Sequence, residues 1–188
     1  MVAIATSAGG LKALSEVLGG LPASFPAMIV VVQHLDPRHP SLIAEILSHR
    51  TALEVTQARD QERLQSGWVY IAPPNHHLLV NPNGTLSLTQ TERVHFVRPS
   101  ADLLFDSVAA SFKARAIAVV LTGTGRDGEM GVQAIKAMGG TVIAEDQNTA
   151  AFSGMPLAAI RTGSVNFVLP LSEVASALIT LVMTRDVE

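Results

Sequence analysis

Short apolar runs alternate with longer segments of helical period along most of the chain. The runs at 2–6, 28–33, 68–71 and 116–121 consist almost entirely of apolar residues. Strands of this kind are typical of a parallel sheet that helices cover on both faces. Strands that alternate with helical segments indicate repeated βαβ units. The pattern therefore predicts a Rossmann-like α/β fold, in which a doubly wound, mostly parallel sheet is flanked by helices.

The predicted elements extend this alternation over the whole chain. We expect strands at 2–6, 28–33, 53–57, 68–71, 116–121, 141–144 and 165–168, and helices at 9–18, 41–50, 101–113, 128–138, 156–161 and 171–184. Two short apolar segments, 78–80 and 86–88, flank the turn residues 81–84, which predicts one antiparallel hairpin. Ser100 and Ser172 are expected as helix N-caps. No repeat or linker divides the sequence, so residues 1–188 are expected to form a single domain.

Composition narrows the classes of function. The formal net charge is −3 and the 13 lysines and arginines are scattered, so no basic patch predicts binding to nucleic acid. The absence of cysteine excludes a disulfide framework and a thiol nucleophile, and it fits a reducing, cytoplasmic compartment. The apolar stretch 178–183 is far shorter than the roughly 20 residues that span a bilayer, so no membrane insertion is expected.

A serine follows the first predicted strand. Ser7 stands between the strand 2–6 and a helix, and Ala8, Gly9 and Gly10 come directly after it. A serine on such a turn projects its hydroxyl from the sheet edge, and the backbone N–H groups after it can stabilise an oxyanion. The segment does not match Gly-x-Ser-x-Gly. By itself, Ser7 is better explained as a helix N-cap beside glycines that pack closely or bind phosphate.

Two further polar residues follow strands that a parallel sheet would bring close to Ser7. His34 comes after the strand 28–33, and Asp127 lies in the glycine-rich loop after the strand 116–121. Successive strands joined by one helix usually lie side by side, so their carboxyl ends meet at one sheet edge. There His34 could take the serine proton and Asp127 could orient the imidazole. The simpler alternatives are that His34 is a polar strand end and that Asp127 caps the helix at 128–138.

The same glycine-rich loop allows a different interpretation. Gly123, Gly125 and Gly128 match the G-x-G-x-x-G pattern of dinucleotide-binding domains, and acidic residues follow at 145–146, about 20 residues on. A carboxylate at Asp127 would, however, oppose a pyrophosphate at the helix N-terminus. A Rossmann-type nucleotide-binding domain is therefore the second hypothesis, and a non-catalytic binding module is the third.

Together, the three segments resemble the catalytic domain of the chemotaxis protein-glutamate methylesterases, the CheB family. The resemblance covers essentially the whole chain. It continues through further motifs: Ala72-Pro73 followed by His76 or His77, the segment 98–105, the segment 121–128, Ala144-Glu145-Asp146 and Gly154-Met155-Pro156. So many motifs in order are more specific than any single glycine loop.

The resemblance implies a role for each candidate residue. Ser7 would be the nucleophile, His34 the general base and acid, and Asp127 the orienting carboxylate. The oxyanion and substrate-binding residues would be Ala8, Gly9, Thr124 and Arg98. Two of these depart from the family's usual pattern, because threonine or serine is common at the position of Ala8, and methionine at the position of Thr124.

The resemblance also implies a substrate and partners. The family hydrolyses methyl esters of glutamates in the helical cytoplasmic region of chemoreceptors and releases methanol, and many members deamidate receptor glutamines. It implies no metal and no organic cofactor. A phosphorylatable receiver domain regulates typical members, and nothing in these 188 residues resembles it. A regulatory receiver domain outside this chain is therefore a possible partner.

Overall fold

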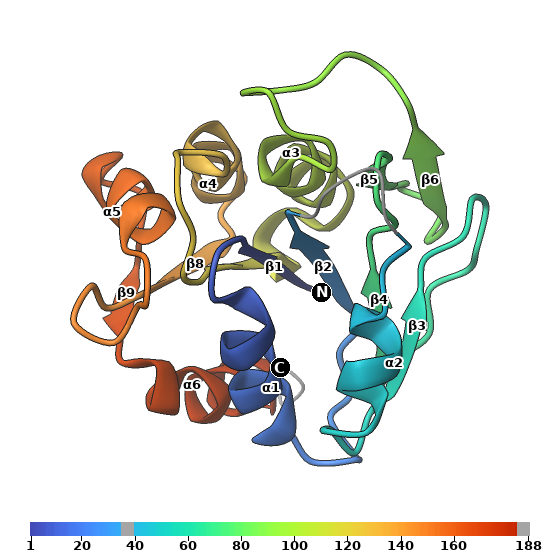
Figure 1. Cartoon of the computed structure of the whole chain (residues 1–188), viewed down its shortest axis with the longest axis horizontal. Coiled ribbons are helices and arrows are strands. Elements are labelled where there is room, and N and C mark those ends of the chain that lie inside the picture. The colour runs from blue at the N-terminus through green and yellow to red at the C-terminus, as the bar shows by residue number, and fades with distance from the viewer. Residues whose placement is uncertain (35–39, 184–188) are drawn as a thin grey trace.

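The structure, a computed structural model, describes residues 1–34 and 40–183 and is built around a seven-stranded parallel sheet. The strand order is β3-β4-β2-β1-β7-β8-β9 (Figure 1). The strands are β1 (Val2–Thr6), β2 (Ile29–Gln33), β3 (Glu54–Gln57), β4 (Trp68–Ile71), β7 (Ile117–Val120), β8 (Thr141–Glu145) and β9 (Phe167–Leu169). The order reverses between β1 and β7. In open α/β sheets, ligands bind outside the carboxyl ends of the strands at such a point.

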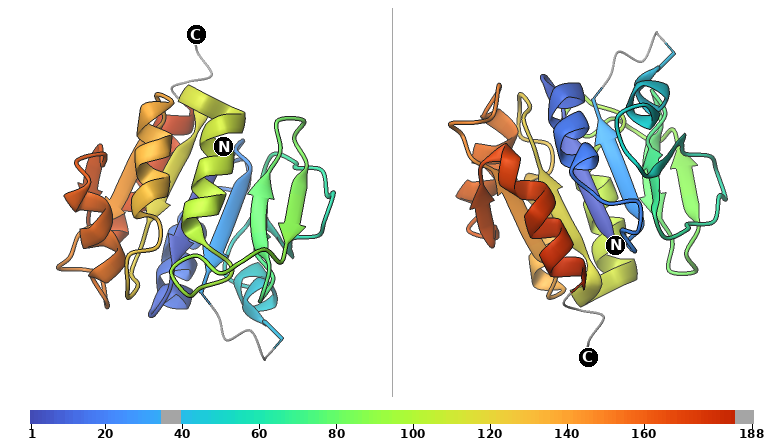
Figure 2. Two further views of the ribbon diagram at one scale, coloured as in Figure 1. Left: turned by 90° about the horizontal axis from the view of Figure 1, so that it is seen from above. Right: turned by 90° about the horizontal axis from the view of Figure 1, so that it is seen from below.

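Helices cover both faces of the sheet (Figures 1 and 2). One face carries α1 (Gly10–Gly19), α2 (Ile43–Ser48) and α6 (Leu171–Met183), and the other carries α3 (Ala101–Phe112), α4 (Glu129–Ala137) and α5 (Gly154–Arg161). A short 3-10 turn, η1 (Lys113–Arg115), follows α3. Since side chains alternate along a strand, β1 contributes Val2 and Ile4 to the α1 side and Ala3 and Ala5 to the α3 side. The sheet is therefore buried on both faces, as its apolar strands predict.

A separate antiparallel hairpin lies beside α3. Its strands are β5 (His77–Val80) and β6 (Leu86–Thr89). The Val80 backbone N–H donates to the Ser107 hydroxyl at 3.0 Å, and the Ser111 hydroxyl donates to the Val80 carbonyl at 2.9 Å. These bonds attach the hairpin to α3.

The predicted fold class is confirmed, and each predicted strand and helix is present, with ends in the described residues that match or differ by one or two residues. The N-cap prediction for Ser172 is wrong. Helix α6 begins at Leu171, directly after Pro170, and the Pro170 carbonyl already accepts the N–H of Glu173 at 2.9 Å. Ser172 therefore lies inside the first turn. No helix in the described ranges is both long and apolar enough to cross a membrane.

Candidate active site

Ser7 lies at the carboxyl edge of the sheet, between the ends of β2 and β7. Its N–H donates to the Thr122 carbonyl at 3.0 Å, and the N–H of His34 donates to the Thr6 carbonyl at 3.1 Å. The Gln33 side chain, which is buried, donates from Nε2 to the carbonyls of Ser7 at 2.7 Å and His34 at 3.0 Å. The backbone of Ser7 is thus held by both neighbouring segments.

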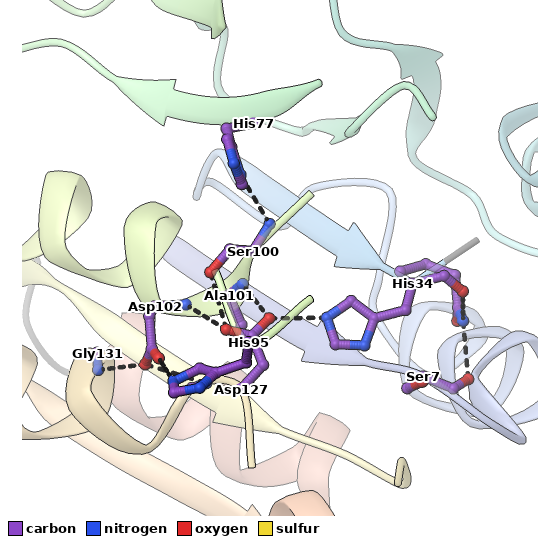
Figure 3. A network of polar contacts seen from close by, with 11 residues as sticks. Ser7, His34, His77, His95, Ser100, Ala101, Asp102, Asp127 and Gly131 are labelled. Atoms are coloured by element: carbon purple, nitrogen blue, oxygen red, sulfur yellow. Dashed lines mark hydrogen bonds and ion pairs between the residues drawn. The ribbon is translucent and has the colours of Figure 1, made fainter. Parts of the chain in front are cut away.

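His34 and Asp127 are in direct contact across this edge. Nε2 of His34 lies 2.7 Å from Oδ2 of Asp127 (Figure 3). A neutral imidazole that bonds a carboxylate through Nε2 carries its proton there, so Nδ1 is the free acceptor. Figure 3 shows this second ring nitrogen on the side of Ser7. No hydrogen bond from the Ser7 hydroxyl itself occurs within residues 1–34 and 40–183.

The carboxylate of Asp127 is buried and accepts hydrogen bonds from four groups (Figure 3). Oδ2 accepts from His34 and from the N–H of Ala101 at 2.6 Å. Oδ1 accepts from the Ser100 hydroxyl at 2.8 Å and from the N–H of Asp102 at 3.1 Å. Burial alone would raise the pKa of Asp127, but the bonds from His34 and the two backbone N–H groups outweigh it and lower the pKa. Asp127 is therefore held ionised and in a fixed orientation.

Asp127 caps a different helix from the one that its sequence position suggests. It stands just before α4, yet its carboxylate receives the N–H groups at the start of α3. In return, Asp102 in the first turn of α3 accepts, through Oδ1, the N–H groups of Gly128 at 3.0 Å and Gly131 at 2.7 Å at the start of α4. The N-terminus of α3 is thus stabilised by an aspartate from the loop before α4, and the N-terminus of α4 by an aspartate of α3. The exchange requires a close approach, because a Cβ at Gly131 would meet Cβ of Phe105 at 2.6 Å.

Ser100 does occupy the N-cap position of α3, but its side chain makes no cap bond. Its hydroxyl instead donates to Asp127, which has taken over the capping function. Its backbone N–H donates to Nδ1 of His77 at 3.1 Å, and Nε2 of His77 bonds the Glu92 carbonyl at 2.9 Å. Burial, as the largest cause, lowers the pKa of His77, which favours the neutral ring that this pairing requires. The family motif left His76 and His77 as alternatives, and the structure shows that His77 makes these bonds.

The sequence did not identify Ser100, Asp102 and His77 as residues that support the site. A weak signal for Asp102 existed, since it is an acidic residue in a first helical turn. Its Oδ2 also lies 3.2 Å from Nε2 of His95, and burial is the largest cause that raises the pKa of Asp102. The bonds that join these residues to the site, from Ser100 to His77 and Asp127 and from Gly128 to Asp102, span 23 to 27 positions, so spacing did not reveal them.

Three of the predicted oxyanion and substrate-binding residues have backbone N–H groups that are free to donate. The N–H groups of Ala8, Gly9 and Thr124 have no acceptor within the described part of the chain. The N–H of Gly123 is already donated to the Phe152 carbonyl at 2.8 Å, so it is unavailable. A Cβ at Gly123 would lie 2.9 Å from Cβ of Ser7, which shows how closely this loop passes the serine. Ala8, Gly9 and Thr124 therefore remain as candidate donors.

Arg98 is occupied elsewhere. Its Nε and Nη2 donate to Oδ1 of Asn75 at 3.1 and 2.6 Å, and Nη1 donates to the carbonyls of Gln90 and Thr91 at 2.9 and 2.7 Å. These partners hold together the loop before α3. The bonds tie Arg98 to this loop, and its role in substrate binding stays a prediction.

Glu145 supports the site from behind and does not face a ligand. It is 1% exposed, and its Oε2 accepts the N–H of Thr122 at 2.8 Å. The Thr122 carbonyl in turn accepts from the Thr6 hydroxyl at 2.6 Å and from Ser7 N–H. Burial, as the largest cause, raises the pKa of Glu145. The nucleotide hypothesis needs an N-terminus of α4 open to phosphate, but Asp102 already accepts the N–H groups of Gly128 and Gly131 there, and Glu145 is buried and engaged.

The described residues contain no group of three or more histidines, aspartates and glutamates that is arranged to hold a metal ion. The chemistry that the arrangement can perform is acid–base and nucleophilic. A hydroxyl, an imidazole and an ionised, oriented carboxylate meet at one edge, with free backbone N–H groups beside the hydroxyl.

The sequence is similar to proteins of a known family. A family model described as CheB methylesterase matches residues 2–178. A protein of Pseudomonas fluorescens named protein-glutamate methylesterase/protein-glutamine glutaminase 1 is 44% identical over 96% of this chain and 54% of its own length. A protein of Leptospira interrogans that carries the same name, given as putative, is 39% identical over 96% of this chain and 93% of its own length.

The fold is also that of a solved structure. The catalytic domain of the Thermotoga maritima CheB methylesterase superposes with a TM-score of 0.93 at 41% identity, covering 96% of this chain and 97% of that one. The chain spans about half the length of the Pseudomonas relative. The matches in sequence and in fold extend over nearly the whole chain, and the chain belongs to the CheB methylesterase family.

Proposed function

We propose that the chain is a serine esterase that hydrolyses methyl esters of glutamate residues in chemoreceptors, with Ser7, His34 and Asp127 as its catalytic triad. The observation that carries the proposal is the 2.7 Å contact between His34 and Asp127, beside Ser7 at the switch point of the sheet. The names of the relatives join methylesterase to glutaminase, so deamidation of glutamine is proposed for the same site.

The proposed reaction begins when Ser7 Oγ attacks the ester carbonyl and Nδ1 of His34 takes its proton. Asp127 stabilises the imidazolium that forms, and the free N–H groups of Ala8, Gly9 and Thr124 donate to the oxyanion. The imidazolium then protonates the leaving methoxide, and methanol departs. Water, activated by His34, attacks the acyl-enzyme and releases glutamate and free Ser7. With an amide substrate, ammonia leaves in place of methanol.

No hydrogen bond joins the Ser7 hydroxyl to His34 in the structure, and this is compatible with the mechanism. Hydrogen bonds between catalytic groups are often long in the free enzyme and tighten when substrate binds.

The test is covalent labelling combined with turnover. The protein is expected to react with a fluorophosphonate and to release methanol from methylated chemoreceptor. Ser7→Ala is expected to abolish the label and to reduce turnover by up to about 10⁶-fold. Ser15→Ala, in which a serine that bonds a carbonyl of its own helix is changed, serves as the matched control. Equal labelling of the Ser7→Ala protein would refute the assignment.

The proposed function also implies a compartment for the reaction and a regulatory domain. The esterified glutamates lie in cytoplasmic helices of the receptor, so we place the reaction in the cytoplasm. We further propose that a receiver domain outside these 188 residues controls access to Ser7. The experiment is to add candidate receiver domains, unphosphorylated and phosphorylated, and to measure methanol release. An unchanged rate would argue against this form of control.

A further inference from the structure

A cavity of about 500 Å³ opens directly beside Ser7, on the side of α1 and α2. This volume is within the range of small-ligand sites. Its lining is formed by Ser7, Gly9, Gly10, Leu11, Lys12, Gln33, Ile43 and Arg50. The mechanism uses only Ser7 and Gly9 of these residues, so the cavity extends the site beyond the reacting atoms.

The charged side chains among the described residues that line this cavity are both cations. Lys12 and Arg50 are both exposed, and neither forms an ion pair within the described part of the chain. Lys12 also borders a second cavity that contains Glu16, but the two do not pair. No carboxylate is among the described residues that line the cavity beside Ser7. Because the chain as a whole has a net charge of −3, these cations are a local feature and not part of a general basic surface.

The start of α1 adds to this positive character. Its first turn holds Lys12 and no acidic residue, and its N-cap, Gly9, offers no side-chain acceptor. The N–H groups of Leu11 and Lys12 have no acceptor among the described residues. Acidic side chains are the usual stabilising neighbours of a helix N-terminus, and a lysine there is unfavourable unless an anion is present.

An unpaired buried acceptor lies at the same place. Gln33 lines the cavity and is 5% exposed, and its Oε1 has no hydrogen-bond partner within the described residues. Unsatisfied polar atoms of this kind are rare in folded proteins. An acidic side chain of the substrate would suit the two cations and the free N–H groups at the start of α1.

We infer that the cavity is a subsite for a carboxylate of the substrate protein, held by Lys12, Arg50 and the free N–H groups of α1 while the neighbouring ester lies at Ser7. The inference rests on the proposed function. On a helix, residues three or four positions apart lie roughly 5–6 Å from each other. An acidic residue at this spacing from the esterified glutamate is therefore close enough to enter the cavity. The subsite would favour esters with an acidic neighbour.

The experiment compares matched helical peptides. Each carries one glutamate methyl ester and, three or four residues to either side, either glutamate or glutamine. At least one glutamate peptide is expected to show a kcat/KM about two- to fivefold higher for each cation engaged, and the preference should decline with added salt. Lys12→Met and Arg50→Met should each reduce this ratio, and the double change Lys12→Glu with Arg50→Glu should invert it. Lys136→Met, an exposed cation on α4, is the matched control and should leave the ratio unchanged.

Failure of the subsite is distinguishable from failure of the esterase. If p-nitrophenyl acetate is hydrolysed by the wild type but not by Ser7→Ala, and both peptide types react equally, the subsite is refuted and the esterase remains. If no ester is hydrolysed, fluorescence anisotropy with peptides that carry glutamine in place of the ester tests the subsite alone. Tighter binding of the acidic peptide that Lys12→Met abolishes would support it, whereas equal binding would refute it.

Discussion

Substitution of Asp127 by asparagine tests both functions of this carboxylate. The change replaces one of two oxygens, each of which accepts two hydrogen bonds at distances from 2.6 to 3.1 Å. In either orientation, the new amide group faces two former donors. An unsatisfied buried donor costs about 1–3 kcal/mol, so the expected loss in free energy of unfolding is about 2–6 kcal/mol.

A change of the His34 tautomer would reduce this loss in free energy of unfolding. It would also lower the catalytic activity. If His34 moves its proton to Nδ1, Nε2 can accept from the asparagine amide, and only one former donor remains unpaired. The free energy of unfolding then falls by about 1–3 kcal/mol. The protonated Nδ1 can no longer take the proton of Ser7. The same substitution in the trypsin triad lowers kcat by about 10⁴-fold for this reason, and a loss of that order is expected here.

The pH dependence separates this account from general destabilisation. Because the pKa of Asp127 is lowered in the folded protein, its ionised form contributes stability above the usual carboxyl range. That contribution is lost as the pH falls through the lowered pKa. The difference in free energy of unfolding between the wild type and Asp127→Asn should therefore be constant near neutral pH and shrink in acid.

The assays are urea denaturation over a series of pH values and methanol release from methylated receptor. Asp106→Asn, at an exposed aspartate on α3, is the control for loss of one negative charge. If Asp127→Asn unfolds like this control at every pH, the account of four donors is wrong. If its turnover stays within tenfold of the wild type, Asp127 does not orient the base.

Three further substitutions test the surroundings of the triad. Ser100→Ala removes a hydroxyl that donates to the Asp127 carboxylate, so the free energy of unfolding should fall by about 1.5–3 kcal/mol in urea denaturation, and an unchanged midpoint would contradict this. Gly123→Ala places a Cβ 2.9 Å from that of Ser7, and displacement of the serine should lower kcat by about 10²-fold in methanol release. Glu145→Gln mimics the protonated form of a carboxyl group whose pKa is raised. The stability of the variant relative to the wild type should therefore rise as the pH increases from the usual carboxyl range through the raised pKa. A difference in thermal unfolding between the two proteins that does not change with pH would argue against the raised pKa.

The local pattern was sufficient to predict most of the fold. Buried parallel strands are continuous apolar runs, so β1, β2, β7 and β8 were recognisable from composition and length alone. The ends of the helices were less accurate, as at α4, where the prediction 128–138 compares with Glu129–Ala137. The Gly128 N-cap explains the difference at the first residue, because its φ of 107° lies in the left-handed region and outside the helix.

The candidate site was predictable to the extent that it depends on strand ends. Ser7, His34 and Asp127 each follow a strand, and parallel strands bring their carboxyl ends to one edge. The surroundings of Arg98 were not predictable from the sequence. A lone arginine in a loop carries no information about its partner, and only the fold shows that Asn75 and two carbonyls occupy its guanidinium.

The sequence by itself determined the fold class, the sheet edge at which the chemistry is proposed and the three residues at that edge. Tertiary structure alone decided how Asp127 is held. The exchange of capping aspartates between α3 and α4 joins positions 25 to 29 residues apart. Hydrophobic periodicity reports which face of an element is buried, but it contains no information on which distant donors satisfy a buried carboxylate. Those partners depend on how closely the two helices pack, which is a property of the whole fold.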